Sequence, residues 1–379
     1  MLITKIDIKN WRNFKNLRVP LNKRTYIIGA NASGKSNLLD VFRFLRDISK
    51  PAGGGLQKAV ADRGGMGKLR CLEARTDPEI KISVEITGEN EDLWKYELGF
   101  AKKGAQVLVT KESATLNGDT VFSRPDTLDE EDIARRTQTH LEQIGANKDF
   151  RPLADFFSDT TYLHLVPQLL KFPEIAGTGV EGDPFGQALL QRISKTPGKT
   201  RDARLNRIQQ TLAVAVPQFK ELKFVQDSVT GNPHLEASYQ HWRKNGAWQR
   251  EDQFSDGTLR LIGMLWMLQE SSNSLLLLEE PELSLNDSIV SNIPLMIDRI
   301  LRKQKAIGRQ VIITTHSEAL LKAPLASESI ILLESSQNGA LARLPNEGER
   351  NLLDAGLSAA EVLLPKTHPN DIQQLGLFK

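Results

Sequence analysis

The 379-residue sequence predicts an α/β protein with a mostly parallel core sheet, an antiparallel β subdomain and an inserted helical lobe. Two short apolar runs near the C-terminal end, Leu275–Leu278 and Val311–Thr314, are typical of buried parallel strands. Near the N-terminus, Thr25–Ile28 leads into a glycine-rich turn and then an apolar-periodic helix over residues 35–47. The middle of the chain lacks this alternation of apolar strands and helices; it has a run of alternating β-type segments followed by segments typical of helix. We therefore expect one sheet built from both ends of the chain, with the middle inserted into it.

These patterns predict that the chain is organised in four consecutive segments. Alternating runs at 81–87, 94–101, 106–116 and 120–123 are separated by turn residues, including the hairpin turn Asn117-Gly118, and predict an antiparallel sheet. Residues 127–160 and 184–215 are typical of helix, with a short strand at Tyr162–Val166 between them. The predicted segments are 1–75, the N-terminal half of the core; 76–125, the antiparallel β subdomain; 126–253, the helical and basic lobe; and 254–379, the C-terminal half of the core.

The composition is that of a globular protein, with 40% hydrophobic and 25% charged residues. No apolar run approaches the roughly 18 residues that a membrane helix needs, and the N-terminus lacks the apolar stretch of a signal peptide. The single cysteine, Cys71, excludes an internal disulfide framework and fits a reducing compartment. We expect a cytoplasmic protein without a membrane partner.

Charge is distributed unevenly along the chain, although the net charge is only +2. From Arg192 to Arg250 there are eleven Lys and Arg residues against four Asp and Glu residues. From Asp126 to Asp183 there are five basic residues against twelve acidic ones. Either the basic stretch meets a polyanion such as DNA, or the two lobes neutralise each other.

The strongest motif is a phosphate-binding loop that follows a strand and opens a helix. Glycine lets backbone N–H groups turn toward phosphates without a Cβ in the way, and the helix N-terminus adds positive potential. Lys35 is expected to reach the β- and γ-phosphates, and the Ser36 hydroxyl is expected to bind Mg²⁺. The expected nucleotide contacts are Gly29, Ala30, Asn31, Ala32, Ser33, Gly34, Lys35, Ser36 and Asn37.

A second motif joins four leucines directly to acidic residues, in Leu275–Leu278 followed by Glu279-Glu280-Pro281-Glu282. Adjacent residues of a strand face opposite ways, so Glu279 and Glu280 cannot have the same role. One can hold Mg²⁺ through water while the other acts as base on the attacking water. Solvated acids at a strand end are the alternative, and the phosphate-binding loop favours the metal site.

Two further motifs gain weight from their positions. Ser255-Asp256-Gly257-Thr258 opens an apolar helix, where Ser255 or Asp256 can cap the N-terminus and leave an anion site. Alone it is only a helix cap, but it stands twenty residues before the four-leucine strand. His316 follows the apolar run Val311–Thr314 and can donate a hydrogen bond to a γ-phosphate, although a lone histidine is more often structural.

Together and in this order, the motifs resemble the ABC-type ATPases, and within them the RecF/SMC and OLD (overcoming lysogenisation defect) branch of predicted ATPases. Asn10-Trp11-Arg12-Asn13-Phe14 is similar to that branch's Asn-Phe-Arg-Ser-Phe segment. Ser255–Thr258 looks like its signature, Glu279–Glu282 like its Walker B ending, Leu283–Asp287 like its D-loop, and His316 like its switch histidine.

The resemblance implies a P-loop ABC-type ATPase head that forms a head-to-tail homodimer with two ATP molecules, each with Mg²⁺, between the copies. Each ATP would lie on the phosphate-binding loop of one copy and be closed by the Ser255 helix of the other. The implied site residues are Lys35, Glu280 as base and His316 for catalysis; Ser36, Glu279 and the Q-loop candidate Gln168 beside the metal; and Arg12, Asn13, Ser255, Asp256, Gly257 and Thr258 at the nucleotide.

The sequence also departs from the family pattern, and these departures bear on the expected metal site and on the expected domain content. Glu279 stands where aspartate is usual and lengthens the reach to the metal, Asn286 stands where histidine is common, and the signature lacks a second glycine. The tail after the last expected strand, Ile330–Leu333, is too short for the TOPRIM nuclease domain of OLD proteins, and no heptad repeat predicts an SMC-type coiled coil. The chain is expected to be the ATPase module alone.

Four functions remain open at this point. The first is an ATP-switched dimer acting on DNA in genome maintenance, repair or phage defence, through the basic stretch with its interleaved Tyr239, Trp242 and Trp248. The second is a regulatory module that recruits or controls a separate effector, a nuclease or toxin, without binding DNA. A transporter's nucleotide-binding subunit fits the signature poorly. A small-molecule kinase has no use for a signature helix more than two hundred residues after its phosphate loop.

Overall fold

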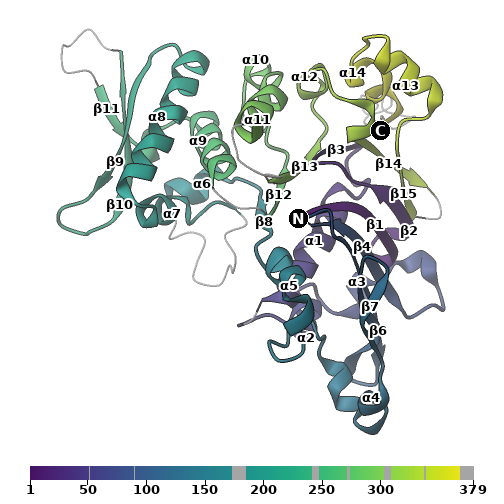
Figure 1. Ribbon diagram of the computed structural model, residues 1–379. Coiled ribbons are helices and arrows are strands. Elements are labelled where there is room, and N and C mark those ends of the chain that lie inside the picture. The colour runs from purple at the N-terminus through teal and green to yellow at the C-terminus, as the bar shows by residue number, and fades with distance from the viewer. Residues whose placement is uncertain are drawn as a thin grey trace, which may run out of the picture. The chain divides into compact units, whose positions relative to one another are not determined.

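The computed structural model describes residues 1–50, 52–88, 90–172, 185–240, 247–270, 274–302, 309–336 and 339–367 (Figure 1). The chain forms two compact units. Unit 1 comprises Met1–Thr161, Ser272–Leu277 and Lys305–Lys379, and unit 2 comprises Tyr162–Ser271 and Leu278–Gln304. These two units do not have the same boundaries as the four segments expected from the sequence, and the division into four segments stays a prediction.

The antiparallel sheet of unit 1 has six strands in the order β2-β1-β4-β5-β6-β7. All four strands expected between residues 81 and 123 are present, but β1 and β2 join them, because β1 pairs with β4 as well as with β2. The first strand thus belongs to this sheet and not to the core sheet. The strands are β1 (Leu2–Trp11), β2 (Phe14–Pro20), β4 (Ile80–Thr87), β5 (Leu93–Lys103), β6 (Gln106–Leu116) and β7 (Asp119–Arg124).

The core sheet of unit 1 is mostly parallel, as expected. Its strands run in the order β15-β14-β3-β13-β12, with β3 parallel to both β13 and β14 and with β15 antiparallel at the edge. The chain passes into unit 2 within β12, after Leu277. The bounds are β3 (Arg24–Gly29), β12 (Leu275–Glu279), β13 (Gln310–Thr315), β14 (Ile330–Ser336) and β15 (Gly339–Arg343).

Helix α1 (Lys35–Ser49) is buried around most of its circumference, which marks a helix enclosed by other elements. Phe44 packs edge-on against Trp11 of β1, with ring centroids 5.2 Å apart, and stacks on Phe100 of β5 at 5.3 Å. The other helices of unit 1 are α2 (Leu56–Ala61), α3 (Met66–Leu69), α4 (Thr127–Glu131), α5 (Arg151–Ser158), α12 (Glu318–Leu321), α13 (Glu347–Asp354) and α14 (Ala359–Val362).

Unit 2 contains several helices and a three-stranded antiparallel sheet in the order β11-β10-β9 (Figure 1). The strand expected at Tyr162–Val166 is shorter and forms β8 (Thr161–Leu163), which crosses the boundary between the units. The remaining elements are α6 (Pro167–Lys171), α7 (Leu189–Lys195), α8 (Gly198–Ala215), β9 (Phe219–Gln226), β10 (Pro233–Tyr239), β11 (Ala247–Arg250), α9 (Asp256–Gln269), α10 (Asp287–Val290) and α11 (Ile293–Arg302). In the described part of the chain, no helix is long and apolar enough to span a membrane.

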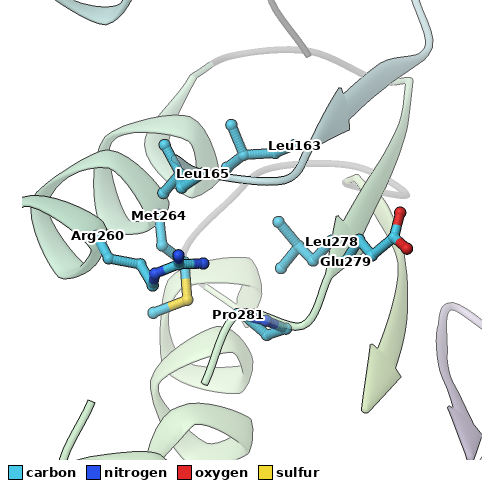
Figure 2. Close-up of a pocket in the computed structure, with 7 residues that line it drawn as sticks. All are labelled: Leu163, Leu165, Arg260, Met264, Leu278, Glu279 and Pro281. Carbon is cyan, nitrogen blue, oxygen red and sulfur yellow. The ribbon is translucent and has the colours of Figure 1, made fainter. Parts of the chain in front are cut away.

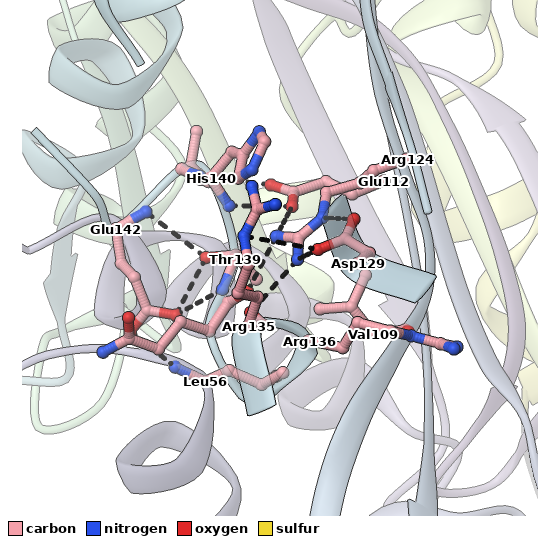
Figure 3. A network of polar contacts seen from close by, with 12 residues as sticks. Leu56, Val109, Glu112, Arg124, Asp129, Arg135, Arg136, Thr139, His140 and Glu142 are labelled. Atoms are coloured by element: carbon pink, nitrogen blue, oxygen red, sulfur yellow. Dashed lines mark hydrogen bonds and ion pairs between the residues drawn. The ribbon is translucent and has the colours of Figure 1, made fainter. Parts of the chain in front are cut away.

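A buried ionic network fastens the segment after β7 to the antiparallel sheet (Figure 3). Arg124, whose side chain is 1% exposed, donates to both carboxylate oxygens of Asp129 and contacts Glu112 at 3.5 Å. Glu112 also accepts hydrogen bonds from the Tyr96 hydroxyl and from the backbone N–H of His140. Burial raises the pKa of Glu112 to about 7, although these donors favour the carboxylate.

This raised pKa predicts a pH dependence of stability. The folded state holds the Glu112 proton more tightly than the unfolded state, whose value is near 4.5. The stabilisation that the protonated Glu112 gives to the folded state is therefore fully present below about pH 4.5 and is lost as the pH rises through about 7. We expect the melting midpoint of Glu112→Gln to fall less between about pH 6 and pH 8 than that of the parent, by a few °C. Scanning calorimetry at both pH values measures the difference. Glu131→Gln, an exposed acid in α4, should keep the parent's slope, and an equal slope in Glu112→Gln would show that this carboxyl does not titrate there.

Candidate nucleotide site

The phosphate-binding loop has a backbone that requires glycine at both of its ends. Gly34 has φ +105°, and a Cβ there would lie 2.4 Å from Nδ2 of Asn13. A Cβ on Gly29 would lie 2.5 Å from Oγ of Ser33 and 2.8 Å from the carbonyl oxygen of Leu333. The loop is therefore a close-fitting backbone cradle, and only glycine lets it close.

The polar groups of the loop fit a phosphate ligand. Lys35 is 7% exposed, and its Nζ donates to the carbonyl oxygens of Gly29 (3.0 Å) and Ala30 (3.1 Å). Oγ of Ser33 is buried and has no hydrogen-bond partner among the described residues. Helix α1 begins at Lys35 with no side chain capping its N-terminus. A folded-back ammonium, an unsatisfied hydroxyl and an uncapped helix N-terminus are the donors that phosphate oxygens would take up.

The N-terminal segment braces this loop. Nδ2 of Asn13 donates to the carbonyl oxygen of Ser33 at 3.1 Å, and Asn37 donates to Oδ1 of Asn13 at 2.9 Å. Nε1 of Trp11 donates to the carbonyl oxygen of Asn37 at 3.0 Å. Asn13 thus lies directly against the loop, and its expected contact with the nucleotide stays a prediction.

Arg12 is held in a different way. Its Nε and Nη2 donate to one carboxylate oxygen of Asp40 in α1, at 3.0 and 2.6 Å. Arg63 contacts the same carboxylate at 3.1 Å and also pairs with Asp47. Arg12 therefore fastens the β1–β2 connection to α1, and its expected contact with the ribose and α-phosphate stays a prediction.

The switch-histidine candidate emerges at the same sheet edge as the loop. Thr315 is paired with Ile28 in the parallel register of β13 and β3, and Leu333 of β14 is paired with Gly29. The carboxyl ends of three neighbouring parallel strands meet there, which is where ligands bind in such sheets. His316 follows Thr315 directly and is exposed.

In unit 2, the acidic pair follows the buried end of β12. The tyrosine hydroxyl of Tyr162 donates to Oε2 of Glu279, and Nδ1 of His164 lies 3.4 Å from the carbonyl oxygen of Glu279. Glu280 has φ +44°, an uncommon conformation for a residue with a Cβ and one that concentrates at functional sites. No group of three or more His, Cys, Asp or Glu side chains could hold a metal ion in the described ranges. Mg²⁺ bound by one or two carboxylates would take its other ligands from phosphates and water.

A small pocket lies beside this strand end (Figure 2). Its walls are mostly apolar, and the Arg260 guanidinium of α9 reaches into it while the Glu279 carboxylate points away. Arg260 is 5% exposed, its Nη1 lies 3.5 Å from the carbonyl oxygen of Glu280, and burial lowers its pKa. The lining residues are Leu163, Leu165, Arg260, Met264, Leu278, Glu279 and Pro281.

The signature segment forms the N-terminus of α9. Oγ of Ser255 accepts from the N–H of Thr258 at 3.2 Å, so Ser255 is the cap. Both carboxylate oxygens of Asp256 are engaged, one by Nε2 of Gln168 and one by Nζ of Lys171, each at 2.8 Å. The structure thus places the Q-loop candidate Gln168 in α6 against the signature, and its expected role at the metal stays a prediction.

The signature glycine contacts the D-loop segment. A Cβ on Gly257 would lie 2.5 Å from the carbonyl oxygen of Ser284, which itself has φ +62°. Asn286 caps α10 by accepting from the N–H of Ser288 at 2.9 Å. The close approach of the Leu283–Asp287 backbone therefore requires glycine at position 257.

Sequence reasoning missed three residues that contact the motifs, namely Tyr162, Lys171 and Arg260. Tyr162 and Lys171 lie 117 and 85 residues away from their partners, so no local pattern indicates either contact. Arg260 had a signal, since it stands one helical turn after Asp256 in an otherwise apolar helix.

Four of the eleven cations in the basic stretch, Arg192–Arg250, form ion pairs within the part of the chain that the structure describes. Lys223 also lies over the Trp248 ring, 3.7 Å from its centroid, and Tyr239 packs edge-on against Phe219. Trp242 lies outside the described residues. The ion pairs are Arg192–Glu270, Arg201–Asp202, Lys223–Glu236, Arg250–Asp227 and Arg250–Glu236.

Comparison with known proteins identifies relatives. A family model described as "AAA domain, putative AbiEii toxin, Type IV TA system" matches residues 24–322. A solved Smc head bound to the C-winged helix domain of ScpA is similar at 18% identity and a TM-score of 0.59, covering 92% of this chain and 99% of that one. A Pyrococcus furiosus Smc head with an extended coiled coil, bound to the C-terminal domain of ScpA, follows at 15% and 0.56, covering 93% and 99%.

A third structure, the Smc head of Pyrococcus yayanosii with a coiled coil and joint, is similar at 11% identity and a TM-score of 0.52, covering 93% of this chain and 99% of that one. No curated protein matches the chain. At such identities the likeness shows the fold, and it confirms the expected α/β P-loop ATPase head.

The cradle geometry predicts the effect of one methyl group. Gly34→Ala forces an alanine into a left-handed conformation, at roughly 1–2 kcal/mol, and places its Cβ against Asn13. We expect affinity for a fluorescent ATP analogue to fall at least about tenfold, which is ~1.4 kcal/mol. The matched control is Gly104→Ala in the β5–β6 turn, where φ is +63° and nothing lies within 4 Å. Equal affinities of the two variants, measured by fluorescence titration, would remove the cradle from nucleotide binding.

Proposed function

We propose that this chain, which belongs to the AAA_21 family and is an ABC-type ATPase of the RecF/SMC-like branch, binds ATP with Mg²⁺ and hydrolyses it as an ATP-sandwiched homodimer. One observation supports the dimer: besides the phosphate-binding loop, the chain has a second helix N-terminus at the signature segment, that of α9, which Ser255 caps and which we propose closes on the ATP of the other copy. An ATPase that closes a nucleotide between two copies needs both elements, whereas a monomeric kinase needs only the first.

The proposed chemistry is transfer of the γ-phosphoryl group to water. Glu280 accepts a proton from the attacking water while the oxygen of that water bonds to the γ-phosphorus. The bond between the γ-phosphorus and the β–γ bridging oxygen breaks, which releases ADP. Lys35 and His316 stabilise negative charge that develops on the phosphate oxygens. Bound Mg²⁺ would neutralise phosphate charge, and Ser36 and Glu279 are the residues that would hold it.

Removing the base should separate binding from hydrolysis. In Glu280→Gln the metal and phosphate contacts survive while the proton acceptor is lost, so we expect ATP turnover to fall by at least about 100-fold. ATP should then accumulate on the protein together with a stable dimer, measured by phosphate release and by light scattering after size exclusion.

The matched control is Glu282→Gln, an acid that lies two residues further on and is 6% exposed. If Glu280→Gln hydrolyses ATP like the parent, Glu280 is not the base. If the parent itself neither binds nor hydrolyses ATP, the proposed function fails as a whole.

We also propose that the dimer acts on DNA, in genome maintenance, repair or phage defence. Four cations of the basic stretch, Arg192–Arg250, are exposed and have no ion pair among the described residues, so they are available to phosphates. Lys199 and Arg207 lie on the 18-residue helix α8. Such cations neutralise phosphates and release counterions, which makes the binding salt-dependent. The four are Lys195, Lys199, Arg207 and Lys220.

Duplex DNA should therefore stimulate ATP turnover at low salt, and the stimulation should fade toward physiological salt. Lys199→Glu with Arg207→Glu should abolish it and leave basal turnover intact. The matched control reverses two exposed cations of unit 1, Lys102 and Lys103. Stimulation that survives in the α8 variant would move the DNA contact elsewhere.

The second candidate is an ATP-dependent module that controls a separate effector protein without touching DNA. The description of the matching family model includes the words "putative AbiEii toxin, Type IV TA system", and two of the similar Smc heads were solved with a domain of ScpA bound. Turnover that is indifferent to DNA at every salt concentration, together with a partner retained by Glu280→Gln in ATP, would favour this candidate.

A further inference from the structure

Two residues on the same side of one short strand hold the acidic end of another. Tyr162 and His164 are two positions apart, so their side chains leave β8 and its extension on the same face. Tyr162 donates its hydroxyl proton to Oε2 of Glu279, and His164 lies against the carbonyl oxygen of the same residue. Glu279 is therefore held by both its side chain and its backbone.

The tyrosine is itself well fixed. Tyr162 is 7% exposed, and Leu163 and Leu165, on the opposite face of the segment, line the apolar pocket (Figure 2). The Glu279 carboxylate points away from that pocket and from Arg260. The hydrogen bond from Tyr162 therefore fixes the direction of this carboxylate.

The need for such a partner follows from the side chain. Compared with aspartate, the Glu279 side chain has one more methylene, which adds one rotatable bond between backbone and carboxylate. An unrestrained glutamate loses that freedom when it binds a metal, at a cost of about 1–2 kcal/mol. A hydrogen bond that selects one rotamer beforehand removes part of this cost.

On the basis of the proposed function, we infer that Tyr162 is a positioning residue that fixes the rotamer in which the carboxylate of Glu279 would bind Mg²⁺. The phenol acts through Glu279 and does not contact the metal. Partners of this kind behind metal ligands typically change metal affinity by about 10- to 100-fold when they are removed.

The test is metal-dependent nucleotide binding by Tyr162→Phe, which removes one hydroxyl and keeps the ring. A fluorescent, non-hydrolysable ATP analogue is titrated onto the full chain at increasing Mg²⁺, and bound Mn²⁺ is counted in parallel by electron paramagnetic resonance. We expect the Mg²⁺ midpoint to rise about 10-fold or more while affinity in EDTA stays that of the parent. The control is Tyr26→Phe, the same change at a tyrosine that is 3% exposed in β3, and it should leave the midpoint unchanged.

A double-mutant cycle with Glu279→Asp separates positioning from packing. Aspartate is one methylene shorter and falls short of Tyr162, so Tyr162→Phe should have no further effect on the Mg²⁺ midpoint in that background. An equal loss in both backgrounds, or an unchanged midpoint in Tyr162→Phe alone, overturns the inference and leaves the ATPase proposal intact. Failure of the parent to bind the analogue at any Mg²⁺ concentration would instead defeat the proposed function.

Discussion

The enclosure of α1 in unit 1 is the constraint on which the phosphate-binding loop depends. Phe44 is wedged between Trp11 and Phe100, and each buried aromatic ring contributes roughly 1.5–3 kcal/mol relative to an exposed one. A helix packed on most sides cannot slide along its axis without opening voids in its surroundings. Its first residue, Lys35, and the left-handed Gly34 before it are therefore held in place by packing far from the loop.

Backbone strain is concentrated in the motif segments, where packing can sustain it. Arg12 (φ +49°), Ala32 (φ +63°), Glu280 (φ +44°) and Ser284 (φ +62°) all carry a Cβ in the left-handed region. Each such residue costs on the order of 1–3 kcal/mol and persists only where neighbours determine it. Arg12 has its bond to Asp40, and the Glu280 carbonyl lies near Arg260. At Arg12, an ion pair thus offsets a backbone conformation that the free chain would avoid.

Sequence patterns predicted the helices, strands and loops that have a strong local pattern. They could not predict which strand pairs with which, or which side chains from distant segments meet. A pattern of only a few residues predicts each of three elements: the glycine loop, the four-leucine strand and the Ser255 cap. The alternation in Leu2–Ile8 suits any sheet with one buried face, so it does not say that β1 pairs with β4. In β9 and β10 the buried positions are few and lie among charged residues, which hid the three-stranded sheet of unit 2. The contacts of Tyr162 and Lys171 arise from chain segments that meet only in the folded state.

The four-leucine strand has a consequence for folding. All of Leu275–Leu278 are at most 1% exposed, so the strand is apolar on both faces, and a slip of one residue would still place leucine at three of these four positions. The leucines by themselves therefore select a register only weakly, and such a segment is also prone to pair with other copies while the chain is incomplete. Glu279 and Glu280 end the run with two charges that resist burial. The acids are thus gatekeepers of the strand: an exchange for apolar residues would lengthen an aggregation-prone segment as well as remove chemistry.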